Sequence, residues 1–110
     1  MPFLGDLEHA VMDVLWARSA PTSVRDVHEA LVGDREIAYT TVMTVLDRLA
    51  KKGIVRRKLD GRAWLYLPAK SRIDLYVDTV DAILVGTSDD DRREIWTRLA
   101  GRLGVTSGVR

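Results

Sequence analysis

The sequence predicts a mainly α-helical chain with one small β-hairpin, on three observations. Apolar residues recur at helical spacing in five segments, and glycine or proline stands near the ends of these segments. An Asp-Gly pair separates two β-prone runs, which is the strongest short hairpin signal. Of the 110 residues, 46% are apolar and 30% are charged, so the chain can bury a core and is not of a disordered type.

Two helices are predicted in the first third of the chain. The first spans residues 6–18, and Pro21 then breaks its pattern because proline cannot continue a helix interior. Ser23 is the expected N-cap of the second helix, with Asp26 placed for a capping box, and Gly33 ends that helix. The expected apolar faces are Leu7, Val11, Val14 and Leu15 in the first helix, and Val24, Val27 and Leu31 in the second.

The third helix and the hairpin follow a short link. The helix is predicted over residues 38–52 with Gly53 as its stop, and strands are predicted over 54–59 and 62–67. The apolar stripe of this helix is Val42, Val45, Leu46 and Leu49. Its other side carries Tyr39, Thr40, Met43, Thr44 and Asp47. Thr41, at the start of the helix, is expected either to share that outer side or to be half-buried.

Two further helices complete the predicted chain. The fourth ends at Gly86, and Ser88 caps the fifth, whose first turn holds three consecutive aspartates that favour the helix dipole. The two helices carry the apolar stripes Ile73, Val77, Val80 and Leu84, and Ile95, Leu99 and Leu103. Trp96 lies beside the second stripe and suits the centre of an interface. A frayed tail is expected from Gly104 onward.

Three helices followed by a hairpin are typical of a winged helix-turn-helix, in which the third helix enters the major groove of DNA. The distribution of charge along the chain agrees with DNA binding by the third helix and the hairpin. Residues 1–36 hold three basic and seven acidic side chains, whereas residues 47–62 hold seven basic and two acidic ones. The basic side chains are candidates for phosphate contacts: Arg48, Lys51, Lys52, Arg56, Arg57, Lys58 and Arg62. Arg62, beside the turn, is the preferred wing contact, and a surface ion pair with Asp60 is its alternative.

Several function classes are excluded or disfavoured by composition. Cysteine is absent, and His9 and His28 are expected on the surfaces of different helices without a third ligand, so no metal site or cofactor is predicted. No nucleophile with an evident base is present, and the chain is predicted not to be an enzyme. No signal peptide or membrane span is expected, which favours a cytoplasmic protein. Trp16 is expected in the core, whereas the face of Trp64 is ambiguous.

Three stretches resemble the penicillinase-repressor family, the BlaI/MecI-type transcriptional regulators. Residues 5–16 are similar to its opening helix, residues 38–53 to its recognition helix, and residues 60–68 to its wing. The family residues that face DNA correspond to Tyr39, Thr40, Thr41, Met43 and Thr44. The resemblance implies a winged-helix DNA-binding domain over residues 1–70 and a helical dimerisation region over residues 71–110. The dimerisation residues would be Ile73, Val77, Val80, Leu84, Ile95, Trp96, Leu99 and Leu103.

The same resemblance implies a homodimeric repressor that binds a palindromic DNA operator. Several members are inactivated through a membrane sensor-protease that triggers cleavage in the C-terminal part. That part is shorter here than is usual in the family. Whether a sensor-protease acts on this protein is therefore left open. A copper-responsive branch uses cysteines that this chain lacks. The alternative function is a winged-helix protein-interaction module without DNA binding, which an acidic or apolar recognition face would have favoured.

Overall fold

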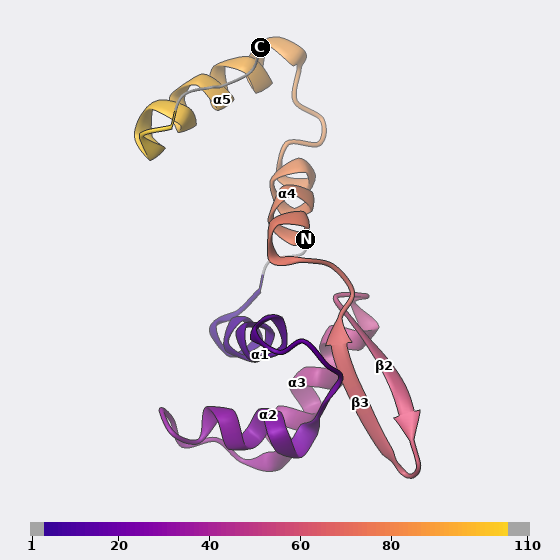
Figure 1. The fold of residues 1–110 in the computed structure, drawn as a ribbon. Helices are drawn as coiled ribbons and strands as arrows, with labels where there is room; N and C mark the ends of the chain where they lie inside the picture. Colours follow the sequence, from indigo (N-terminus) through magenta and orange to yellow (C-terminus); the bar gives the residue numbers. More distant parts are fainter. Residues whose placement is uncertain (1–3, 106–110) are drawn as a thin grey trace.

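The computed structural model describes residues 4–105 and contains five α-helices and three short strands in that range. The elements in chain order are α1 (Asp6–Ala17), β1 (Thr22–Ser23), α2 (Val24–Leu31), α3 (Tyr39–Lys51), β2 (Val55–Asp60), β3 (Ala63–Pro68), α4 (Arg72–Ile83) and α5 (Asp89–Leu103). Figure 1 shows α1, α2 and α3 packed together, with the β2–β3 hairpin beside them. This is the predicted winged helix-turn-helix, and α4 and α5 extend away from it (Figure 1).

Most predicted helix starts and stops are confirmed to within about one residue because the capping residues act as expected, but α4 ends at Ile83, before the stop predicted at Gly86. The hydroxyl of Ser23 accepts from the backbone N–H of Asp26 at 3.1 Å, and that of Ser88 accepts from Asp91 at 3.1 Å. Gly53 follows the C-cap of α3 with φ of 77°, a left-handed conformation that glycine adopts without strain. The strands begin and end one residue later than predicted.

The sheet has one strand that the sequence did not predict. Its order is β1-β3-β2, with all pairs antiparallel, and β1 joins through the register Thr22 to Tyr66. Thr22 is buried, and its hydroxyl donates to the backbone oxygen of Ala20 at 3.0 Å. A strand of two residues is too short to show an alternating pattern, which is why periodicity could not reveal it. This pairing ties the hairpin to the start of α2.

The core lies among α1, α2, α3 and the inner face of the hairpin. Its largest fully buried side chains include Met12, Leu15, Leu46 and Leu49. The predicted stripes of α2 and α3 are confirmed as buried. On α1 the prediction was partly wrong: Leu7 and Val14 are only partly buried, whereas Met12 and Glu8 are buried. Glu8 is buried because its carboxylate has partners, described below.

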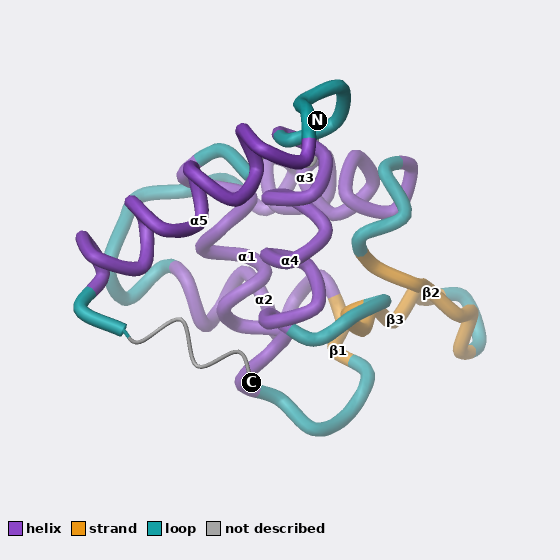
Figure 2. Tube along the Cα trace, turned by 90° about the horizontal axis from the view of Figure 1, so that it is seen from above, coloured by secondary structure: helices purple, strands orange, loops and turns teal. Residues whose placement is uncertain are grey.

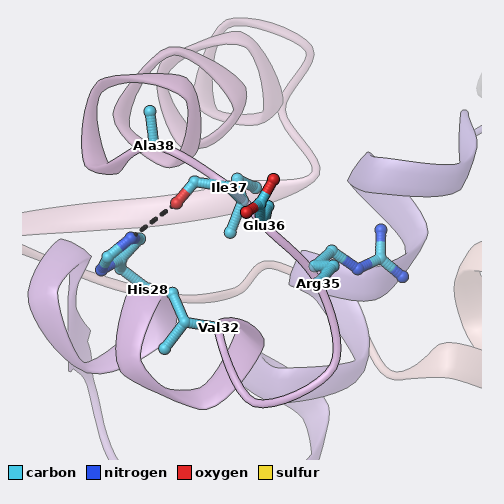
Figure 3. A pocket seen from close by; sticks show the side chains of 6 residues that line it. All are labelled: His28, Val32, Arg35, Glu36, Ile37 and Ala38. Atoms are coloured by element: carbon cyan, nitrogen blue, oxygen red, sulfur yellow. Dashed lines mark hydrogen bonds between the residues drawn. The ribbon is translucent and has the colours of Figure 1, made fainter.

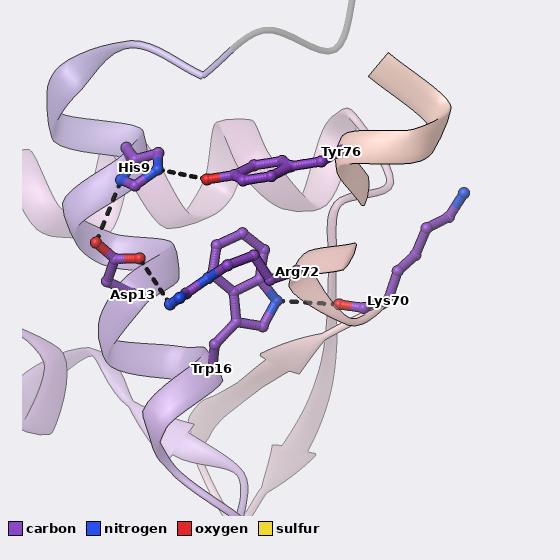
Figure 4. A network of polar contacts seen from close by, with 6 residues as sticks. All are labelled: His9, Asp13, Trp16, Lys70, Arg72 and Tyr76. Carbon is purple, nitrogen blue, oxygen red and sulfur yellow. Dashed lines mark hydrogen bonds and ion pairs between the residues drawn. The ribbon is translucent and has the colours of Figure 1, made fainter. Parts of the chain in front are cut away.

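α4 is fastened to α1 by a cluster of aromatic and polar side chains (Figure 4). The hydroxyl of Tyr76 lies 2.7 Å from Nε2 of His9, and Arg72 pairs with Asp13 at 3.1 Å. Tyr76 also packs edge-on against Trp16, with ring centroids 6.2 Å apart. His9 lies at the surface of α1, as predicted, and it also links two helices, which the sequence did not predict. Leu75, from the same turn of α4, is buried in the core.

Trp16 takes part in the same junction and is only partly buried, so its prediction as a core residue holds in part. Its indole N–H donates to the backbone oxygen of Lys70 at 3.0 Å, and the guanidinium of Arg72 lies 5.0 Å from its ring centroid. These contacts fix the segment where the hairpin ends and α4 begins.

The C-terminal helices give the chain an elongated shape. Its radius of gyration is 17.1 Å and its long axis measures 51 Å, whereas about 13 Å is expected for a compact chain of this length. Seen from above in Figure 2, α4 overlies α1 while the hairpin projects to one side. Among residues 4–105, no helix has the length and apolar character needed to cross a membrane.

Candidate nucleic-acid interface

The outer face of α3 is exposed and polar. All five predicted base-facing residues are exposed, including Thr41, which is not half-buried. They are Tyr39, Thr40, Thr41, Met43 and Thr44. The exposed fractions of Tyr39 and Met43 are 44% and 43%, large values for side chains of this kind. Thr40, Met43 and Thr44 lie opposite the buried stripe, and Tyr39 and Thr41 flank them on either side of the helix.

The start of α3 is held in place by a histidine from α2. Nε2 of His28 lies 2.8 Å from the backbone oxygen of Ile37, just before the helix (Figure 3). The imidazole also packs edge-on against Tyr39, with ring centroids 5.8 Å apart. His28 was predicted as a surface residue, and this holds in part: it is half-buried, and its contact fixes the turn of the helix-turn-helix. Nothing in a single sequence links a histidine on one helix to a loop oxygen nine residues later.

α3 forms a ridge with a groove on each side. The groove on the hairpin side is lined by Met43, Thr44, Asp47, Arg57, Trp64 and Tyr66. The groove on the α1 side is lined by Leu7, Thr40, Thr41, Thr44, Val45 and Arg48. Thr44 borders both, and its hydroxyl donates to the backbone oxygen of Thr40 at 3.0 Å. The hydroxyl oxygen and methyl group of Thr44 therefore remain available at the crest of the ridge.

The seven predicted phosphate contacts are all exposed, but they divide into two groups. Within the part of the chain that the structure describes, four form no ion pair: Arg48, Arg56, Lys58 and Arg62. The expected alternative for Arg62, a pair with Asp60, is not formed. Three are paired: Lys51 and Arg57 with Asp47, and Lys52 with Glu8. The sequence could not make this distinction, because it depends on tertiary contacts.

Lys52 is the cation most firmly committed to the fold. Its Nζ lies 2.9 Å from Oε2 of Glu8, whose other oxygen accepts the backbone N–H of Gly5 at 3.1 Å. Burial opposes ionisation of Glu8, but the hydrogen bonds from Lys52 and Gly5 and the charges of Lys52 and Arg48 outweigh it and lower the pKa of this carboxyl. The main role of Lys52 is thus to pair with Glu8 within the fold.

Asp47 accepts two cations on the outer surface of α3. Its Oδ2 lies 3.1 Å from Nζ of Lys51, and its Oδ1 lies 3.3 Å from Nη1 of Arg57. The hydrogen bond from Lys51 and the charges of Lys51 and Arg57 lower the pKa of Asp47. Sequence reasoning placed Asp47 on this face but gave it no role.

Trp64 is the second residue of the interface that sequence reasoning left unassigned. It lines the groove on the hairpin side, and the guanidinium of Arg57 lies 4.7 Å from its ring centroid. The hairpin turns at Gly61 and Arg62 and pairs Leu59 with Trp64 and Arg57 with Tyr66, which puts Arg57 and Trp64 diagonally on one face. The predicted Asp60-Gly61 turn would instead pair Leu59 with Arg62, so the predicted register differs from the observed one by one position on each strand.

No group of three or more His, Cys, Asp or Glu side chains in residues 4–105 is placed to hold a metal ion. The pocket in Figure 3 is an open hollow beside the turn before α3, lined by His28 and its neighbours.

The chain is similar to known proteins in sequence and in structure. The family described as penicillinase repressor matches residues 4–107. The transcriptional regulator BlaI of Mycobacterium tuberculosis is 48% identical over 103 residues, which cover 93% of this chain and 75% of that protein. Two solved structures are similar at 32% identity, each covering 66% of this chain and 88% of its own. One is the DNA-binding domain of the repressor BlaI, with a TM-score of 0.59. The other is Bacillus licheniformis BlaI in monomeric form in complex with the blaP half-operator, with a TM-score of 0.56.

The family match extends over nearly the whole chain, and it includes α3, the hairpin and both C-terminal helices. The polar ridge of α3 and its flanking cations agree with what such regulators require. The chain belongs to the penicillinase repressor family and is a DNA-binding transcriptional repressor, not an enzyme.

Proposed function

We propose that the protein represses transcription as a homodimer that binds a palindromic operator, with α3 of each copy in the major groove. The observation that carries this proposal is the exposed ridge of α3, with polar side chains at its crest and cations on its flanks. Threonine hydroxyls can bond base edges, and the thioether of Met43 can meet a thymine methyl. Promoter occlusion is the simplest way in which such binding represses.

Base contacts are assigned to Tyr39, Thr40, Thr41, Met43 and Thr44. Phosphate contacts come first from the four cations without an ion pair, Arg48, Arg56, Lys58 and Arg62, which keep all their N–H groups for DNA. Lys51 and Arg57 contribute next, since each shares its charge with Asp47. Lys52 contributes least, because Glu8 already neutralises it. Of these, Arg62 lies beside the turn of the hairpin and serves the wing.

A second copy of the chain is the partner proposed for α4 and α5. Their apolar side chains remain in water: Ile73 is 69% exposed, Val77 61% and Leu103 70%. A cavity of about 460 Å³ lies between the helices, lined by Trp96 and the apolar side of α4. An isologous contact would cover this surface in both copies at once. The proposed dimerisation residues are Ile73, Val77, Val80, Leu84, Ile95, Trp96, Leu99 and Leu103.

The two functional parts are proposed as residues 1–70 for DNA binding and residues 71–110 for dimerisation. Residues 106–110 lie outside the described range. Leu75 is buried in the core and Tyr76 contacts α1, so the dimerisation part begins with a turn that also supports the DNA-binding part. A repressor acts where the chromosome is, and we assign this one to the cytoplasm.

The test is a titration of the full chain against duplexes from its own upstream region and against scrambled duplexes, at several salt concentrations. A repressor should bind one upstream duplex at least about a thousandfold more tightly than the scrambled ones. Equal affinity for all duplexes would contradict operator recognition. An absence of binding at low salt would favour the protein-interaction function instead.

A further inference from the structure

One cation of the interface differs from the others in being held on two sides. Nη1 of Arg57 bonds Oδ1 of Asp47 at 3.3 Å, and its guanidinium lies over the ring of Trp64, 4.7 Å from the centroid. The two contacts come from different elements, α3 and β3. Arg57 therefore bridges the recognition helix and the hairpin.

These contacts restrict the side chain of Arg57 more than that of Lys51. Its exposed fraction is 36%, whereas that of Lys51, the other partner of Asp47, is 76%. A long exposed cation must lose rotamer freedom when it binds a phosphate. Arg57 has already lost much of this freedom in the free protein, so binding costs it less. Its remaining N–H groups are in a fixed plane, the geometry that phosphate oxygens accept in pairs.

Arg57 lies where a restricted side chain can position the DNA backbone. It lines the groove beside Met43 and Thr44, the residues assigned to base contacts. A phosphate held there would fix the distance between the DNA backbone and the crest of α3. Contacts of this kind set the register in which base contacts can form, although they carry no sequence information themselves.

We propose that Arg57 is a pre-oriented phosphate clamp that sets the register of α3 in the major groove, and that Asp47 and Trp64 are its positioning residues. The proposal rests on the proposed function, operator binding through α3. It separates Arg57 from cations that only supply positive charge. It also gives a reason for a carboxylate at Asp47 on a surface that binds a polyanion, where its charge alone would weaken binding.

The decisive variant is Asp47→Asn, because charge and positioning predict opposite results. The change makes the protein more positive, so electrostatics alone predicts tighter binding to every duplex. If Asp47 positions Arg57, cognate affinity should instead fall by about three- to tenfold relative to scrambled DNA. Glu94→Gln on α5 is the matched control. It removes the same charge from a carboxylate paired with Arg98 at 2.8 Å, and it should leave the ratio of cognate to scrambled affinity unchanged.

Arg57→Lys tests the clamp itself, since it keeps the charge and loses the planar fork. The cognate affinity should fall about tenfold, with scrambled-DNA affinity nearly unchanged. Arg98→Lys is the matched control and should alter neither affinity. Trp64→Phe should keep most of the cognate affinity, whereas Trp64→Ala should lose as much as Asp47→Asn. Melting curves establish that each variant is folded before it is titrated.

A set of operators with a single neutral methylphosphonate identifies the phosphate. At one position per half-site the neutral group should weaken the parent protein but not Arg57→Lys. The proposal is overturned if Asp47→Asn tightens cognate and scrambled binding alike, or if no methylphosphonate distinguishes the parent from Arg57→Lys. A parent that shows no preference for any upstream duplex would contradict the proposed function itself, which is a separate outcome.

Discussion

Nζ of Lys52 lies 2.9 Å from Oε2 of Glu8, so the C-terminal end of α3 is joined to the first turn of α1. Glu8 is 8% exposed and also accepts the N–H of Gly5, which caps α1. One carboxylate thus satisfies a helix start and holds the C-terminal end of α3 against α1.

Glu8→Gln is expected to lower the free energy of unfolding by about 1–2 kcal/mol at neutral pH, because a charged hydrogen bond is replaced by a neutral one. The pKa of Glu8 is lowered in the folded state, so its contribution is present above the ordinary value of 4.5 and is lost as pH falls through the folded value. The stabilities of parent and variant should therefore converge below about pH 4.5. Urea titrations at several pH values measure this.

The control for this experiment is Glu29→Gln, whose carboxylate pairs with Arg25 on the surface of α2 and is 61% exposed. An exposed pair of this kind contributes little, and the change should be under about 0.5 kcal/mol. A constant gap between parent and Glu8→Gln down to the lowest pH would show that Glu8 acts through packing and not through its charge.

The salt dependence of DNA affinity should distinguish the cations without an ion pair from Lys52. A dimer with three or four phosphate contacts per copy should show a slope of log affinity against log salt of about −5 to −7. Arg62→Ala removes one contact from each copy and should make this slope shallower by about 2. Lys52→Ala should leave the slope nearly unchanged and lower the melting temperature instead. Equal effects of the two variants on the slope would mean that Lys52 leaves Glu8 when DNA binds.

Met43→Ala and Thr44→Ala should lower operator affinity without lowering the stability of the fold. If these side chains contact bases, each change should cost about 1–3 kcal/mol at the cognate operator and little on scrambled DNA. Both side chains are exposed, so the stability should change by less than about 1 kcal/mol. Leu46→Ala, in the buried stripe of the same helix, should instead cost about 2–5 kcal/mol of folding free energy. Melting curves and paired titrations measure both effects.

Val77→Asp should yield a folded monomer. Val77 is 61% exposed, so the aspartate disturbs no core, but a dimer would bury its charge against an apolar surface. Light scattering on a sizing column should give half the mass of the parent, and operator affinity should fall with it. Val32→Asp, at the end of α2 and 45% exposed, is the control that should remain dimeric. A parent that is itself monomeric at tens of micromolar would contradict dimerisation through α4 and α5.

The sequence was sufficient for the five helices and the hairpin because their signals are local, but it was not sufficient for β1. Ser23, Ser88 and Gly53 each mark a helix boundary through one backbone conformation or one hydrogen bond, and Gly61 marks the turn, which lies one residue later than the predicted Asp60-Gly61 loop. It was insufficient where function depends on tertiary contacts. The bond from His28 to the oxygen of Ile37 joins a helix to a loop, and no periodicity records such a pairing.

The candidate interface shows the same division. The exposed face of α3 followed from helical spacing, since the buried stripe defines its opposite side. Which cations are free did not follow, because Asp47 takes its partners from its own helix and from a strand ten residues away. Charge counting along the chain treats Lys52 and Arg62 as equals, and only the fold separates them.

The junction of α1 with α4 has a consequence for the DNA as well as for the protein. His9, Trp16 and Tyr76 fix the direction of α4 relative to the recognition helix (Figure 4). If α4 also forms the dimer contact, the two recognition helices are joined by a stiff arm and not by a hinge. Successive major grooves on one side of DNA recur about every 10–10.5 base pairs. The rigid arm then requires both half-sites to face the same side of the DNA. Inserting a few base pairs at the centre of the operator rotates one half-site about the DNA axis, and the second recognition helix can no longer reach it.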